Sequence, residues 1–441
     1  MHIRQIFATM LALACLSLVL RGHRSSRDLQ PSDRGAQRRA RNPTGRGESP
    51  LASLRAARSG AEVARLVAEL KPRSSKHFTV CISAYGRVHD WRRATGLLDQ
   101  MRQCGSAPNV FSFSAAISAC GKSGQWERAL ELLDEMRERG VEPNVISFSA
   151  AISACEKGGQ WERALELLDE MRQCGIEPDV IIFSAAVSAC EKGGQWERAL
   201  ELLREIHQCG IEPDVIIYSA AISACEKGGQ WERALELLEE MGRCGVEPNS
   251  FSYSAAIQAC AAAGQPAHAL QLFNRLEASQ VDTSMCCFNA ILDALVRAHP
   301  DRARELWKLG CARGCYHSFE RWSSSSGLCL QLDLHDLSEG AAETAVRWWL
   351  EERVRDRERL HQPVPERLEL ITGWGKSRGA TDKGDVRARI ERVLREMDET
   401  VLPTENLGML IVARGGGRHK QRDVHRDAAE GARRLHVAGG K

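Results

Sequence analysis

Residues 143–174 read PNVISFSAAISACEKGGQWERALELLDEMRQC, and residues 178–209 repeat this text almost letter for letter. A tryptophan sets the period and returns every 35 residues, at Trp91, Trp126, Trp161, Trp196 and Trp231. A fixed period of this length is typical of an array in which each unit buries its apolar face against its neighbours. The sequence therefore predicts a repeat array and excludes a single compact core for this part of the chain.

Each unit has the pattern of two helices separated by helix breakers. In the quoted unit, Val145–Lys157 is followed by the Gly158-Gly159 pair, and Trp161–Cys174 is followed by Gly175 and Pro178. Glycine and proline at such positions end helices. We expect a helical hairpin in every unit.

The second helix of the unit carries an apolar stripe. Ala164, Leu168 and Met171 have i, i+4, i+7 spacing, and Leu165 and Leu167 widen the stripe. Such a stripe must be buried against neighbouring helices. The fold expected for the array is an all-α helical-repeat solenoid.

A proline supports the start of this second helix. Pro266 stands where earlier units have tryptophan. Proline is tolerated in the first turn of a helix, where its missing N–H leaves no hydrogen bond unmade. The second helix is thus expected to begin directly after Gln160 and its equivalents.

The cysteine pattern follows the repeat. Of 16 cysteines, five recur at one repeat position, namely Cys120, Cys155, Cys190, Cys225 and Cys260. Equivalent positions on stacked repeats should lie farther apart than the roughly 7 Å between Cα atoms that a disulfide allows. We interpret these five as small apolar packing residues. The group Cys311, Cys315 and His317 lacks a fourth ligand and is a weak zinc signal, so no metal site is predicted.

The segment Pro143–Cys155, followed by Ala164–Leu168 and Met171, resembles the pentatricopeptide repeat. The resemblance covers about residues 72–310, with clear units from Ser75 to Asn249, a weaker unit to Ser284 and a degraded one to about Gly310. The tetratricopeptide repeat, which binds protein, has a period of about 34 residues. The period of 35 without a slip favours the pentatricopeptide repeat. The resemblance implies single-stranded RNA as the ligand, with one base on each unit.

The family reads a base with two residues, the fifth of a unit and the last residue before the next unit. The implied pairs here are Thr79 with Asn109, Ser114 with Asn144, Ser149 with Asp179, Ser184 with Asp214, and Ser219 with Asn249. A carboxylate accepts the two N–H donors of guanine's pairing edge, whereas an amide complements adenine. The family code reads the pairs as adenine, adenine, guanine, guanine, adenine from 5′ to 3′, and leaves Ser254 with Ser284 undecided. The alternative role is an N-cap, which asparagine and aspartate also favour.

Two further sets of residues complete the expected RNA surface. The family sandwiches bases between apolar second residues, here Phe111, Ile146, Ile181, Ile216 and Phe251. Lysines recur at the end of the first helix, at Lys122, Lys157, Lys192 and Lys227, where they are expected to contact phosphate. Cations there also complement the helix dipole, which is the alternative role. Lys76 departs from the apolar pattern, and the expected basic strip runs from about Arg87 to Lys227.

After the array the pattern changes to alternating strands and helices. The serine run at 323–326 is interpreted as a linker, followed by strands at 327–335, 368–371 and 407–412 and helices at about 338–353 and 385–397. Val386, Ile390, Val393, Leu394 and Met397 are expected to face inward. Strands alternating with helices predict a small α/β domain at residues 327–415.

Two motifs of this domain, Leu332–His335 and Thr372–Lys376, resemble the paired motifs of SMR domains, a family that includes endonucleases. The resemblance implies His335 as acid or base, Asp333 as its orienter or a metal ligand, and a divalent metal ion as the cofactor to consider. Backbone N–H groups of a glycine-rich turn bind phosphate. Phosphate contact is therefore assigned to Thr372, Gly373 and Gly375, and Lys376, which adds positive charge at this turn, is assigned to the catalytic group with Asp333 and His335. Two departures from the family, Asp336 and Ser377, put cleavage in doubt, because an acid beside the site repels phosphate.

The N-terminus has the composition of a targeting segment. An apolar run at residues 6–20 follows Arg4 and suits a signal peptide, and residues 21–50 hold eight arginines against three acids. This order predicts import into a plastid through the secretory route, with a mitochondrial or an ordinary secretory signal as alternatives. No later segment is a membrane-span candidate, so no membrane contact is expected after targeting.

The resulting domain map has targeting segments at 1–20 and 21–50, a helical lead-in at 51–71 and the array at 72–310. A linker at 311–326, the SMR-like domain at 327–415 and a disordered basic tail at 416–441 follow. Five or six purine-rich bases at about 1 to 3 kcal/mol each do not define one site in a large RNA pool, so a second domain or a protein partner is expected to contribute. The hypotheses are guided RNA cleavage, RNA stabilisation or translation without catalysis, and DNA nicking.

Overall fold

The computed structural model describes residues 50–279, 281–316, 320–323, 329–354, 359, 367–372, 386–404 and 408–413. The expected targeting segments at 1–50 lie outside the described residues except for residue 50, and so do the turn at 373–376, the tail at 416–441 and His317. No described helix is both long and apolar enough to cross a membrane.

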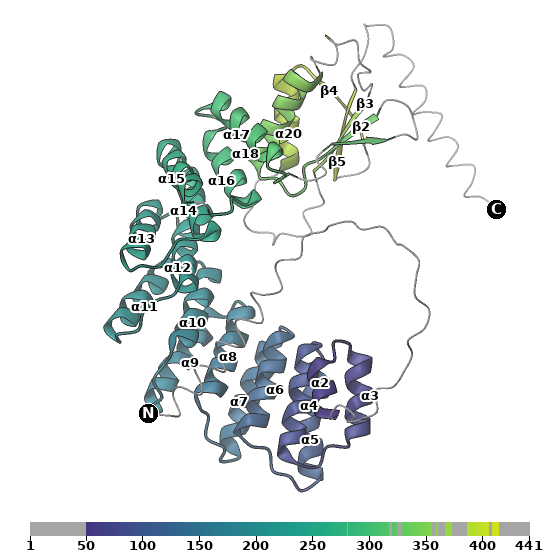
Figure 1. Ribbon diagram of the computed structural model, residues 1–441, viewed down its shortest axis with the longest axis vertical. Helices are drawn as coiled ribbons and strands as arrows, with labels where there is room; N and C mark the ends of the chain where they lie inside the picture. The colour runs from purple at the N-terminus through teal and green to yellow at the C-terminus, as the bar shows by residue number, and fades with distance from the viewer. Residues whose placement is uncertain are drawn as a thin grey trace, which may run out of the picture. The chain divides into compact units, whose positions relative to one another are not determined.

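The array is built from helical hairpins. After α2 (Pro50–Ala56) and α3 (Gly60–Leu70), the pairs are α4 (Ser75–Arg87) with α5 (Trp91–Gln103), α6 (Val110–Lys122) with α7 (Trp126–Glu138), α8 (Val145–Lys157) with α9 (Trp161–Gln173), α10 (Val180–Lys192) with α11 (Trp196–Gln208), α12 (Val215–Lys227) with α13 (Trp231–Arg243), α14 (Ser250–Ala262) with α15 (Pro266–Ala278), and α16 (Met285–Leu295) with α17 (Pro300–Ala312). First helices contact one another from α4 to α16, and each second helix contacts the first helix of the next unit (Figure 1). The predicted solenoid is confirmed.

The helix boundaries follow from local chemistry. Asn144 caps the N-terminus of α8. Beyond the C-terminus of α8 the chain turns at Gly159, whose φ of +68° lies in the left-handed region that glycine adopts without strain. The Gln160 N–H then donates to the Cys155 carbonyl (2.9 Å), which closes the end of α8. Pro266 is the first residue of α15, so the prediction drawn from this proline is confirmed.

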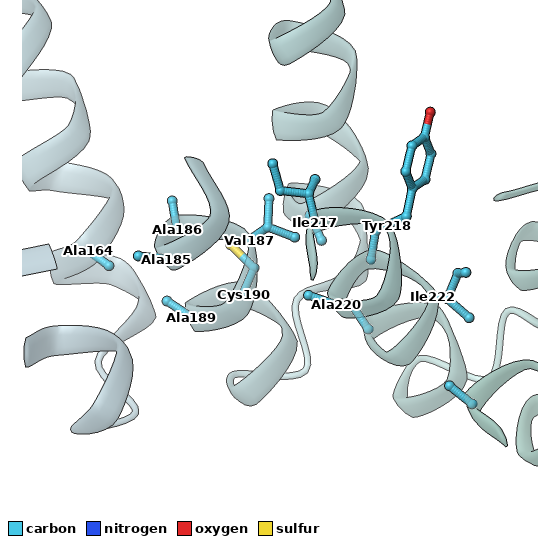
Figure 2. Close-up of a cluster of buried hydrophobic side chains, with 14 of the residues drawn as sticks. Ala164, Ala185, Ala186, Val187, Ala189, Cys190, Ile217, Tyr218, Ala220 and Ile222 are labelled. Carbon is cyan, nitrogen blue, oxygen red and sulfur yellow. The ribbon is translucent and has the colours of Figure 1, made fainter. Parts of the chain in front are cut away.

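Small side chains fill the core between units. Ala185, Ala186 and Cys190 on α10 are buried between neighbouring hairpins, with Tyr218 and Ile222 of α12 in the same cluster (Figure 2). The recurring cysteines are all buried and free, and burial raises the pKa of each thiol to about 11. Their predicted packing role is confirmed.

The Gly-Gly pair has a second function that the sequence did not predict. A Cβ atom at Gly158 would overlap the indole of Trp126 in the preceding unit, and Gly193 stands in the same relation to Trp161. The tryptophan that recurs every 35 residues thus packs against the backbone of the first glycine of the pair in the next unit. The second glycine makes the turn.

The C-terminal domain contains a five-stranded sheet in the order β1-β2-β3-β5-β4. Its strands are β1 (Glu320–Ser323), β2 (Cys329–Asp333), β3 (Arg367–Ile371), β4 (Thr400–Leu402) and β5 (Met409–Ala413). β2 and β3 are parallel, and the other neighbours are antiparallel. The predicted α/β domain is confirmed, with two corrections. β1 lies where a linker was expected, and β4 was not predicted because it is only three residues long.

Two helices cover this sheet. α18 (Glu339–Trp348) begins at Ser338, whose hydroxyl accepts from the Ala341 N–H as predicted, and it passes into a π-helical segment, η1 (Trp349–Val354). α20 (Val386–Glu396) buries Ile390, Val393 and Leu394, with Val386 and Met397 partly buried against the core. The buried carboxylate of Glu343 on α18 accepts from Arg347 (2.9 Å) and Arg389 (2.6 Å), which ties the two helices together.

Candidate nucleic-acid interface

A row of exposed apolar side chains runs along the first helices of the array. In the first helices α6, α8, α10, α12 and α14, the second residue is more than half exposed, at 59% for Phe111, 53% for Ile146, 51% for Ile181, 57% for Ile216 and 57% for Phe251. Among the described residues, Val145 at 37% is the one other large apolar side chain with more than about a third of its surface in solvent. The row coincides with the residues expected to sandwich bases. The same position of five successive units thus leaves a large apolar side chain in water, which makes this row the candidate binding surface.

The residue before each of these helices is an N-cap. Asn109, Asn144, Asp179, Asp214 and Asn249 each accept, through the side-chain oxygen, the backbone N–H of the third helical residue. The capping role weighed in the sequence analysis is therefore real. It does not exclude base reading, because the cap uses Oδ1 and leaves the second polar atom of the side chain to other partners. In the first unit that atom, Asn109 Nδ2, donates to Ser75 Oγ (2.8 Å).

The fifth residues differ in accessibility. Ser149 and Ser184 are half-buried, as is Thr79, whose hydroxyl donates to the Ser75 carbonyl (2.9 Å). Ser114 and Ser219 are each only 4% exposed. Ser114 donates to the Val110 carbonyl (2.7 Å), whereas the Ser219 hydroxyl is buried and has no hydrogen-bond partner within the described part of the chain. The units centred on Ser149 and Ser184, which pair with the two aspartates, thus offer the more open hydroxyls.

The lysines at the ends of the first helices fall into two groups. Lys192 Nζ lies 2.5 Å from Glu156 of the preceding unit, and Lys227 Nζ lies 2.6 Å from Glu191. The residue 36 positions before Lys122 is Gly86 and the residue 36 positions before Lys157 is Gly121, so these lysines lack the equivalent acid. The sequence did not reveal this difference, because the pairing joins residues of different units.

Lys122 and Lys157, the lysines without the equivalent acid, form a positive cluster with Arg87. Burial, together with the charges of Lys157 and Arg87, lowers the pKa of Lys122. Arg87 also donates to the Leu54 carbonyl of α2 (2.5 Å). The basic strip expected from Arg87 to Lys227 is therefore uncompensated at its N-terminal end and paired with acids at its C-terminal end. Exposed ion pairs contribute only about 0–1 kcal/mol, so a phosphate can compete for the paired lysines.

In the α/β domain, Asp333 and His335 contact each other. His335 Nδ1 is hydrogen-bonded to Asp333 Oδ1, and the His335 N–H donates to the same oxygen (3.3 Å). His335 Nε2 lies 3.1 Å from Asp336 Oδ2. One prediction is corrected here: the strand ends at Asp333, so His335 is held by the turn after β2 and not by the strand.

The second SMR-like motif begins beside the first. Asp333 pairs with Ile371 in the parallel register, and the Leu334 N–H donates to the Ile371 carbonyl (2.8 Å). Thr372 follows at the same sheet edge, and its buried hydroxyl has no hydrogen-bond partner among the residues that the structure describes. Gly373, Gly375 and Lys376 lie outside the described residues. The described part of both motifs therefore meets at the carboxyl ends of two parallel strands, where α/β sheets place their ligands.

The described residues contain no group of three side chains able to hold a metal ion. Near His335, the two carboxylates of Asp333 and Asp336 each contact a ring nitrogen. Cys315 Sγ contacts the Thr283 carbonyl (3.7 Å).

The fold is thus an α-solenoid of helical hairpins with an exposed apolar and polar row along one layer of helices. Residues 74–123 and 166–229 match the pentatricopeptide repeat domain, and residues 108–157 and 213–262 match the PPR repeat family. Residues 146–176 and 251–281 match the PPR repeat. The chain therefore contains pentatricopeptide repeats, and the matched residues end before the α/β domain.

Similar solved structures have the same type of repeat. The pentatricopeptide repeat protein PPR10 from maize is 21% identical, with a TM-score of 0.49, and the match covers 77% of this chain and 46% of that chain. PPR10 in complex with an 18-nt psaJ RNA element is 18% identical, with a TM-score of 0.42 and coverage of 68% and 46%. The PPR domain of Arabidopsis thaliana protein-only RNase P 1 in complex with tRNA is 18% identical, with a TM-score of 0.36 and coverage of 44% and 95%. The chain thus spans about half the length of PPR10. No curated protein matches it.

Proposed function

We propose that the array binds single-stranded RNA, one base per unit, along the row from Phe111 to Phe251. The observation that carries this proposal is the set of large apolar side chains that remain more than half exposed at the same position of five successive units. Bases stack on aromatic side chains such as Phe111 and Phe251 without regard to sequence, at about 1–3 kcal/mol for each base. The three isoleucines of the row offer apolar surface on which a base can pack.

Sequence preference comes from the polar pairs beside the row. Asp179 and Asp214 supply acceptor-only carboxylates for guanine, and Asn109, Asn144 and Asn249 supply amides for adenine. In the order implied by the family code, the preferred RNA is A-A-G-G-A from 5′ to 3′, with one further base on the unit of Ser254. The ligand is therefore a purine-rich single strand of about five to six bases.

Fluorescence anisotropy with this RNA tests the proposal. The full chain should bind the single-stranded RNA and should not bind the same sequence as duplex DNA. Neutralisation of three phosphates by Arg87, Lys122 and Lys157 gives a slope of log K against log salt of about −2. Absence of RNA binding at low salt, or equal binding to duplex DNA, would remove the proposal.

RNA cleavage by the α/β domain is a second candidate, favoured by the contact between Asp333 and His335. Asp333 holds a proton on His335 Nδ1 and so leaves Nε2 able to take up or deliver a proton at a bound ribose or phosphate. Asp336 contacts Nε2 at 3.1 Å and must move away before this happens. Lys376 is proposed to bind the phosphate.

The variants His335→Ala and Asp336→Asn separate cleavage from simple binding. If His335 is catalytic, RNA carrying the purine run is cut by the wild type, is not cut by His335→Ala and is cut faster by Asp336→Asn. Equal cleavage by wild type and His335→Ala, or none by any variant, leaves RNA stabilisation without catalysis as the function of the chain. Parallel reactions with supercoiled DNA test the DNA-nicking alternative.

We propose the plastid as the compartment, on the composition of residues 1–50. A fusion of residues 1–50 to a fluorescent protein should accumulate in plastids. Accumulation in mitochondria or secretion of the fusion would select one of the alternatives.

A further inference from the structure

The last unit of the array differs from the others at both positions that contact a base. By the 35-residue period, Cys286 on α16 corresponds to Phe251, and Asn289 corresponds to the fifth residue Ser254. Cys286 is exposed but small, so it lacks the aromatic or aliphatic surface on which a base stacks. The apolar row therefore ends at Phe251.

The polar atoms of Asn289 already have partners in the chain. Its Nδ2 donates to the Asp336 carbonyl (3.1 Å), and its Oδ1 accepts from the Tyr316 hydroxyl (3.3 Å). Its carbonyl accepts from the Ser338 hydroxyl (3.3 Å). Two of these three partners belong to the turn that follows His335. The side chain that would read a seventh base is thus engaged with the α/β domain.

One turn further along α16, Asp293 binds the start of α18. Its Oδ1 accepts from the Gly340 N–H (2.6 Å), one of the donors that a helix N-terminus leaves open. A Cβ at Gly340 would lie 2.6 Å from that oxygen and 2.7 Å from the Asp293 Cα. Only glycine at position 340 permits this close approach, so the contact between α16 and α18 depends on the absence of a side chain there.

Ion pairs extend the contact to the second helix of the unit. Arg304 of α17 lies 2.5 Å from Glu351, and Lys308 lies 2.6 Å from Glu352. A cavity of about 710 Å³ remains beside the contact, lined by Gln258 of the sixth unit, Arg297 and Ser338. The sixth unit therefore faces open space where the seventh meets the α/β domain.

We infer that the seventh unit, residues 285–312, is a docking platform for the α/β domain and does not bind a base. This inference rests on the proposed RNA binding of the array and limits it to six bases. The RNA strand leaves the array at the cavity beside Arg297, and the nucleotide 3′ of the sixth base is the first to meet the turn Leu334–Ser338. The platform thus fixes the distance between the recognised sequence and His335.

A length series tests the inference with the full chain. RNAs of four to eight bases, all starting with the preferred purines, should bind about fivefold or more tightly for each base up to six, in line with the stacking contribution of a base. The seventh base should change Kd by less than twofold, whichever base it is.

Two variants report on the docking itself. Gly340→Leu introduces a clash with Asp293, and its matched control is Gly242→Leu, a helical glycine of α13 with open space around its Cβ. The double variant Asn289→Ala/Asp293→Ala removes the hydrogen bonds without a clash, should Gly340→Leu fail to fold. We expect accelerated hydrogen exchange over residues 334–345 for the docking variants and wild-type exchange for the control.

The outcomes distinguish the two proposals. Binding that grows to six bases and stops, with exchange that rises only in the docking variants, supports the platform. A seventh base that tightens binding as much as the sixth, or docking variants with wild-type exchange, overturns the platform and leaves RNA binding intact. Failure of every RNA to bind overturns the proposed function and the platform with it.

Discussion

Substitution of Phe111 by alanine should weaken RNA binding without weakening the fold. Phe111 is 59% exposed, so about 120 Å² of a side chain of roughly 200 Å² is in contact with solvent. A stacked base that covers half of this area contributes about 1.5 kcal/mol at about 25 cal/mol per Å². We therefore expect Phe111→Ala to raise Kd about tenfold, measured by fluorescence anisotropy with the A-A-G-G-A RNA.

The matched control lies two residues away on the same helix. Phe113 is fully buried, so Phe113→Ala should lower the free energy of unfolding by about 3–5 kcal/mol. Phe111→Ala should change it by about 0.5 kcal/mol or less, because it removes few buried contacts. Urea unfolding followed by circular dichroism gives both values. A folded Phe111→Ala protein that binds RNA within twofold of wild type would refute the stacking argument.

Two other predictions concern charges. Glu156→Gln with Glu191→Gln frees Lys192 and Lys227 from their acids, so RNA should bind more tightly and the salt slope should steepen by about 0.7 for each lysine that gains a phosphate; an unchanged slope would show that these lysines do not reach RNA. Burial raises the pKa of Asp293 from 3.8 to about 6, so the folded state binds this proton more tightly than the unfolded state. The contribution of Asp293 protonation to the free energy of unfolding is complete below pH about 4. It is lost as the pH rises through about 6, by up to about 3 kcal/mol. Urea unfolding at a series of pH values should show this loss in wild type and not in Asp293→Asn, and equal pH profiles would contradict the assignment.

Local sequence chemistry predicted the array well. Breakers such as Gly159 and Pro266 act within a few residues of where they stand, and the 35-residue period repeats the same local information in each unit. The row was placed from the family resemblance, which points to the second residue of each first helix, and the structure leaves the side chains there more than half exposed from Phe111 to Phe251. The burial of the five recurring cysteines without disulfides was predicted correctly because the 35-residue period places them on successive units.

Contacts between residues far apart in the chain could not be predicted from the sequence. The pairing of Lys192 with Glu156 depends on how far one hairpin shifts along the next, which no single unit encodes. The residues of β1 have little strand propensity of their own, and β1 forms by pairing with β2. The docking of Gly340 on Asp293 joins two domains whose sequence patterns were interpreted separately. In hindsight, Cys286 in place of a large apolar residue was the one signal that the last unit differs.

The most direct test of base reading by the array is the double variant Asp179→Asn/Asp214→Asn. Asparagine caps a helix about as well as aspartate, so the helices α10 and α12 are retained and only the base-facing chemistry changes. In anisotropy measurements, wild type should bind A-A-G-G-A more tightly than A-A-A-A-A, and the double variant should reverse this order. An unchanged order in a folded variant would contradict the reading of guanine by these two aspartates.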